Sequence, residues 1–127
     1  MKSVPQLFGY FEAFDISFMQ ARATADFYVR RTEVDPAASD ELKQSCVQVH
    51  DEAGQAILEI EAFKADIGIA ESSGSEGDLV KANRMMDHCR QRMRQFNAQL
   101  EKIGDEVAKI HKGPVLIVPS KREEERN

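Results

Sequence analysis

The chain has 127 residues, a length typical of a single domain that buries its own core without disulfides or metal. Hydrophobic residues make up 42% and charged residues 31% of it, which fits a soluble helical protein and excludes a chain too polar to fold. The net charge of -5 argues against nucleic acid or an anionic membrane as the main partner, because both attract basic surfaces.

The sequence also indicates a compartment. Met1 to Pro5 is too short and polar for a signal peptide, and no apolar run approaches the roughly 20 residues that a membrane span needs. Cys46 and Cys89 fall on positions predicted to be buried, so we expect free thiols in a reducing environment. The expected location is the cytoplasm.

The first predicted helix covers residues 5–31. Ser3 and Gln6 fit a capping box, and Pro5 suits a first helical turn. Apolar residues then recur in alternating steps of four and three, the heptad pattern by which one helix packs along another. These predicted core positions are Leu7, Phe11, Phe14, Phe18, Ala21, Ala25 and Tyr28.

The same helix carries a second apolar set on its other side, made of Ala13, Ile16, Met19, Ala23 and Phe27. A helix that is apolar around most of its circumference is expected to be buried around most of it. One three-helix bundle would leave this set partly exposed, so we interpret Ile16, Met19, Ala23 and Phe27 as a self-association or partner surface. The alternative is a wide inward face with scattered surface apolar residues, which needs no partner.

The second predicted helix covers residues 36–70, with Asp35 as its N-cap and Pro36 in its first turn. Its heptad pattern continues without a slip. The predicted core positions are Leu42, Cys46, Val49, Ala53, Ala56, Ile60, Phe63, Ile67 and Ala70.

A polar, glycine-bearing loop follows at Glu71 to Gly77, and the third predicted helix covers residues 76–112. Ser75 and Asp78 fit a capping box at its start, while Gly113 and Pro114 end it. The predicted core positions are Leu79, Ala82, Met86, Cys89, Met93, Phe96, Leu100, Ile103, Val107 and Ile110.

Short connections between long helices force neighbours to be antiparallel, so the predicted fold is all-α: three long antiparallel helices in a coiled-coil-like bundle. The charges agree, because folding the second hairpin brings the basic Arg92 opposite the stretch between Glu52 and Glu59. Residues 1–113 are the predicted domain. Residues 114–127 are expected to be an extended segment followed by a disordered charged tail.

The extended segment contains a second candidate surface, the β-type run Val115, Leu116, Ile117 and Val118. Such a run could add as a strand to a partner or to a second copy. It could also be a strap over one end of the bundle.

The sequence predicts no catalytic, cofactor-binding or metal-binding site. Cys46 and His50 have a spacing that two metal ligands could use, but the fold separates them from His88 and Cys89 along the bundle. The Glu-x-x-His pairs of di-iron bundles, phosphate-binding glycine loops and nucleophile motifs are not found. The sequence therefore predicts a protein that is not an enzyme.

The stretch His50-Asp51-Glu52-Ala53-Gly54 resembles the motif of histidine phosphotransfer domains, which are helical bundles with a glycine four residues after the histidine. The resemblance implies a signalling module that uses His50. The family's lysine position is Ala53 here, and Asp51 and Glu52 would repel a phosphoryl group.

The prediction from these features is a helical protein-interaction module: an adaptor, a scaffold or a small acidic chaperone that acts through apolar helix surfaces and self-associates. Small acidic proteins with long helices occur among bacterial secretion and flagellar chaperones, an analogy of size and charge. Besides the phosphotransfer module, the alternative is a nucleic-acid-associated protein that uses the basic first half of the third helix. Its residues are Lys81, Arg84, Arg90, Arg92 and Arg94.

Overall fold

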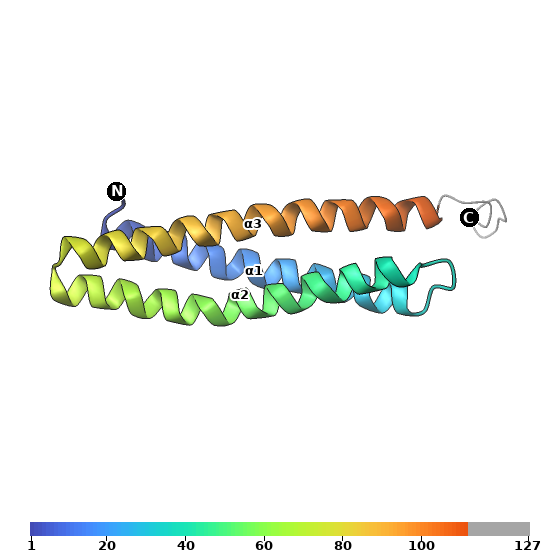
Figure 1. Ribbon diagram of the computed structural model, residues 1–127, viewed down its shortest axis with the longest axis horizontal. Helices are drawn as coiled ribbons and strands as arrows, with labels where there is room; N and C mark the ends of the chain where they lie inside the picture. Colours follow the sequence, from blue (N-terminus) through green and yellow to red (C-terminus); the bar gives the residue numbers. More distant parts are fainter. Residues whose placement is uncertain (112–127) are drawn as a thin grey trace.

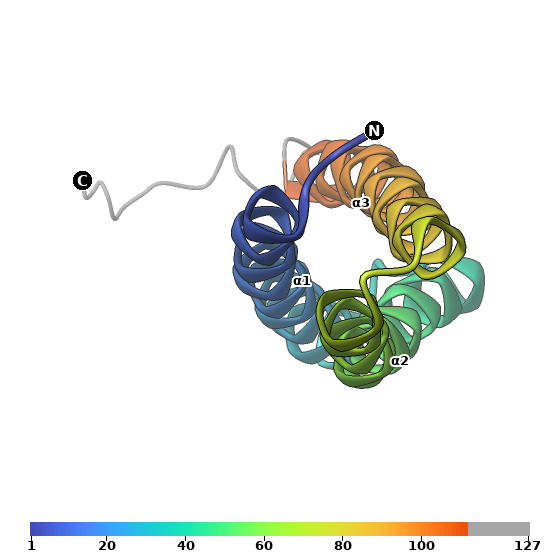
Figure 2. The same cartoon turned by 90° about the vertical axis from the view of Figure 1, so that its left-hand side faces the viewer.

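The computed structural model describes residues 1–111, which form three α-helices: α1 (Val4–Glu33), α2 (Asp40–Ser73) and α3 (Glu76–His111). The helices lie side by side along an elongated bundle, with α2 antiparallel to both α1 and α3 (Figure 1). Seen end on, they surround one common axis (Figure 2), and each helix contacts the other two. The predicted all-α bundle of three long helices is confirmed.

The core follows the bundle axis and is built from the predicted heptad positions. Every predicted core position of α2 is buried, and those of α1 are buried from Leu7 to Ala25, with Tyr28 half-buried. Aromatic contacts join the helices: the ring centroids of Phe11 and Phe63 lie 6.0 Å apart, and those of Phe18 and Phe96 meet edge to face at 5.7 Å. Burial of each such ring contributes about 2–3 kcal/mol to the hydrophobic driving force.

The start of α1 is as predicted. Ser3 is the N-cap, its backbone N–H donates to the Gln6 side-chain oxygen at 2.9 Å, and Pro5 lies in the first turn. The N–H groups in the first turn of a helix have no acceptor within the helix and need other partners, whereas proline has no backbone N–H that needs one.

The predicted start of α2 was wrong. The Asp35 carboxylate accepts the N–H of Ala37 at 2.9 Å, which closes a turn over Pro36 instead of starting a helix. This turn directs Ala38 into the core. The N-cap is Ser39, whose hydroxyl accepts the N–H of Leu42 at 3.1 Å. The acidic first turn that follows favours a helix start by its interaction with the helix dipole.

The connection from α2 to α3 is shorter than the predicted loop. Helix α2 continues to Ser73, and Gly74 ends it in the left-handed conformation with φ of 65°, its N–H donating to the carbonyl of Ala70. The Ser75 hydroxyl accepts the N–H of Asp78 at 3.4 Å, so the serine part of the predicted capping box is present. The Asp78 carboxylate accepts a hydrogen bond from the Ser73 hydroxyl at 2.7 Å.

Charges align α3 with α2 as expected. The Arg92 side chain donates to the carbonyl oxygen of Glu52 at 3.2 Å, and its Nε lies 3.6 Å from the Glu59 carboxylate. One end of the hairpin is joined by Lys81 and Asp66 at 3.6 Å. Such pairs contribute little individually but disfavour other registers.

The predicted helix stop at Gly113 and Pro114, the run Val115 to Val118 and the charged tail lie outside the described residues. Within residues 1–111, no helix is long and apolar enough to cross a membrane.

Candidate interaction surface

The second apolar set of α1 lies on the outside of the bundle, as expected from its spacing. We call Ala13, Ile16, Met19, Ala23 and Phe27 the outer stripe of α1. Its large side chains are more than half exposed: 58% for Ile16 and 56% each for Met19 and Phe27. Exposure on this scale is unusual for three large apolar residues on one helix face, since apolar contact area is normally removed from water.

Helix α2 adds a second exposed stripe that the sequence analysis missed. Leu58 is 66% exposed and Ile69 is 53% exposed, and Ala62 and Ala65 complete the steps of four, three and four between them. The signal was present in the sequence, because these steps repeat the helical period on the side opposite the core positions.

Helix α3 differs from both. In the described part of the chain, the large exposed apolar side chains within helices all belong to α1 or α2. The exposed positions of α3 are mostly polar or charged, for example Arg84, Gln91 and Asp105. The large exposed apolar side chains of the described helices are therefore confined to α1 and α2.

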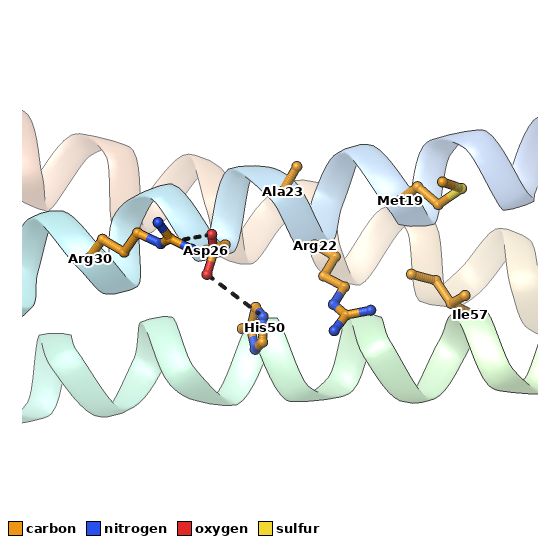
Figure 3. Close-up of a pocket in the computed structure, with 7 residues that line it drawn as sticks. All are labelled: Met19, Arg22, Ala23, Asp26, Arg30, His50 and Ile57. Atoms are coloured by element: carbon orange, nitrogen blue, oxygen red, sulfur yellow. Dashed lines mark ion pairs between the residues drawn. The ribbon is translucent and has the colours of Figure 1, made fainter.

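A shallow groove of about 470 Å³ lies between α1 and α2 (Figure 3). At one end, Met19 of α1 and Ile57 of α2 provide apolar walls, and Ala23 lies nearer the middle of the groove. Arg22 reaches from α1 toward α2, where it lies over Gly54. Part of the predicted surface thus forms a concave site.

The other end of the groove is polar. The Asp26 carboxylate lies 3.0 Å from Nε of Arg30 and 4.0 Å from Nε2 of His50 (Figure 3). The second ring nitrogen of His50 lies 3.2 Å from the Asp51 carboxylate. Both nitrogens of His50 therefore face carboxylates, which would repel an incoming phosphoryl group.

Contacts between α1 and α2 fix the register of the two stripes along the bundle. Phe11 packs on Phe63, and Asp26 lies near His50. This register places Ile16 of α1 level with Leu58 of α2. The two stripes therefore lie at the same level along the bundle, each on the outer face of its own helix.

Both cysteines are buried free thiols. Burial raises the pKa of the Cys89 thiol from its ordinary value of 9.0 to about 11, the nearby Glu59 carboxylate adds to this rise, and Arg92 opposes it. Burial also raises the pKa of Cys46. Such thiols are poor nucleophiles at neutral pH. Within residues 1–111, no three histidine, cysteine or acidic side chains gather closely enough to hold a metal ion.

The basic first half of α3 is largely engaged inside the chain. Lys81 pairs with Asp66, Arg90 with Asp87, and Arg92 with Glu59. These pairs reduce the positive charge available to a phosphate backbone.

No protein-family model, no curated protein and no solved structure matches the chain. Of the predicted contact residues, Ile16, Met19, Ala23 and Phe27 lie on the outer face of α1, with Met19 and Ala23 in the groove. Val115, Leu116, Ile117 and Val118 lie outside the described residues.

Proposed function

We propose that this protein is a non-enzymatic helical interaction module, an adaptor, scaffold or small acidic chaperone, that binds protein partners through the outer face of α1. The cytoplasm is the location we propose with it, because two free thiols suit a reducing compartment.

One observation carries the proposal: the outer stripe of α1 keeps Ile16, Met19 and Phe27 more than half exposed, while the outer face of α3 is polar. Both helices have a complete heptad pattern toward the core, so the stripe is not needed to close the bundle. Exposed apolar side chains at helical spacing beside a groove are what a helix-in-groove contact uses.

The two alternatives have weaker support. His50 has a carboxylate at each ring nitrogen, and three of the basic residues of α3 already form ion pairs. We therefore do not propose a phosphotransfer or nucleic-acid function.

The experiment compares two double variants of the full chain. Ile16→Glu with Phe27→Glu places two acids in the outer stripe, and Ala98→Glu with Ala108→Glu places two acids on exposed positions of α3. Each tagged variant is expressed in its native cells and captured after cross-linking, and bound proteins, including untagged copies of the chain, are quantified by mass spectrometry.

The expected result is that the α1 variant loses at least 90% of the proteins captured by the wild type, while the α3 variant retains them. Circular dichroism should show that both variants keep the helical content of the wild type, since all four positions are exposed. Equal capture by both variants would overturn the proposal.

A further inference from the structure

The α1 residues around the groove have a regular arrangement that the proposed function does not use. Six positions follow each other in steps of four, three, four, three and four: Glu12, Ile16, Met19, Ala23, Asp26 and Arg30. All six share the outer side of α1. Met19, Ala23, Asp26 and Arg30 line the groove next to α2, and Ile16 and Glu12 continue the row beyond it. This row is one narrow helix face.

Read in opposite directions, the row matches itself at two of its three symmetric pairs. About a centre at residue 21, Met19 is opposite Ala23, so a large side chain faces a small one. Glu12 is opposite Arg30, so an acid faces a base. A two-fold symmetric contact between antiparallel helices requires this kind of match, because each residue meets the same partner position in the other copy.

The charges at the two ends are available for such a contact. Glu12 is exposed and has no ion-pair partner within residues 1–111. Arg30 uses Nε for Asp26, which leaves the N–H groups of its terminal nitrogens for a second carboxylate. The third symmetric pair places Ile16 opposite Asp26, whose carboxylate is already paired with Arg30 and with His50 of α2 (Figure 3).

The area is also sufficient. The row from Glu12 to Arg30 is about 27 Å long at the helical rise of 1.5 Å per residue, and two adjacent helices are about 20 Å wide. A second copy that covers both the row and the adjoining edge of α2 would therefore bury about 500 Å² per protomer and about 1,000 Å² in total, the size at which specific interfaces begin.

We propose that a second copy of this chain occupies the groove, with its α1 antiparallel to α1 of the first copy and centred near residue 21. Each Met19 then packs on the partner's Ala23 beside Ile57, and two equivalent ion pairs join Glu12 to the partner's Arg30. This inference rests on the proposed function, since it takes the outer face of α1 as a contact surface and names a second copy as the partner.

The test is a charge swap followed by sedimentation equilibrium of the full chain over a range of concentrations. Wild type should be dimeric. Glu12→Arg and Arg30→Glu should each weaken dimerisation about tenfold, because either change replaces two attractive pairs by two repulsive ones. The double variant E12R/R30E should recover most of the loss. Glu101→Arg and Arg94→Glu, the same charge changes on the outer side of α3, should leave the dissociation constant unchanged.

A wild type that is monomeric at high concentration would overturn the inference. The inference would also be overturned if the wild type is a dimer that neither Glu12→Arg nor Arg30→Glu weakens. The same holds if E12R/R30E weakens the dimer by as much as the two single variants together. A monomeric wild type could still capture other proteins that the Ile16→Glu, Phe27→Glu variant does not capture. In that case the second copy is wrong as the partner, while the proposed function holds.

Discussion

Helices α1 and α3 present the same kind of face to the core and opposite kinds of face to the solvent. Phe18 of α1 meets Phe96 of α3 edge to face in the interior, and both side chains are buried. On the outside, α1 exposes Ile16 and Met19, whereas α3 exposes polar residues such as Gln91. The inward faces explain the fold of both helices. The outward apolar face of α1 is a surplus that folding alone does not require.

Substitutions on the inner faces of α1 and α3 should lower the free energy of unfolding by similar amounts, and these are the largest effects that we expect. Phe18→Ala and Phe96→Ala should each lower the free energy of unfolding by about 3–5 kcal/mol, because each removes a buried ring and leaves a cavity. Urea denaturation of the two variants checks this. A loss below about 1 kcal/mol for either one would show that its helix is not firmly packed in the bundle.

The inner face of α3 should also make stability depend on alkaline pH. The pKa of Cys89 is about 11 in the folded chain and near its ordinary 9.0 when unfolded. Below pH 9 the thiol is protonated in both states and its contribution to stability is complete. Between pH 9 and 11 only the unfolded state releases the proton, so the free energy of unfolding falls, by an amount on the order of 2 kcal/mol.

Denaturation at pH 8, 9, 10 and 11 measures this fall, and Cys89→Ala should reduce its slope. All other groups of the chain are common to both proteins, so their contributions cancel in the comparison. Identical slopes for wild type and Cys89→Ala would contradict the buried environment of this thiol.

The outer faces should contribute least to the stability of the monomer. Ile16→Ala on α1 and Gln91→Ala on α3 should each change its free energy of unfolding by less than about 0.5 kcal/mol, since both side chains are exposed. Dilute samples separate this effect from association. A loss above about 2 kcal/mol for Ile16→Ala at low concentration would mean that the outer stripe stabilises the single chain instead of serving a contact.

Most of the fold could be predicted because its information is local. The step from Leu42 to Cys46 to Val49, repeated along the helix, identifies the buried side without knowledge of the neighbours. The start of α2 could not be predicted in the same way, since Asp35 and Ser39 are both good caps. The choice depends on the turn over Pro36, in which the Asp35 carboxylate is used for Ala37.

The candidate surface was predictable in part. The spacing of Ile16, Met19, Ala23 and Phe27 identified the outer stripe, but the groove depends on which residues of α2 lie beside α1. The contacts of Asp26 with His50 and of Arg22 with Gly54 follow from the register between the helices. Heptad spacing alone does not fix this register, because a shift of one helix along the other by whole turns still matches the apolar positions.

The central claim, that the outer face of α1 is a contact surface and that of α3 is not, is tested most directly by photo-cross-linking in native cells. A photoreactive amino acid is placed at position 16 on α1 or at position 98 on α3, both exposed. We expect a discrete cross-linked species from position 16, either a second copy or another protein, and none from position 98. Cross-linking that is absent at position 16, or equal at the two positions, would contradict the account.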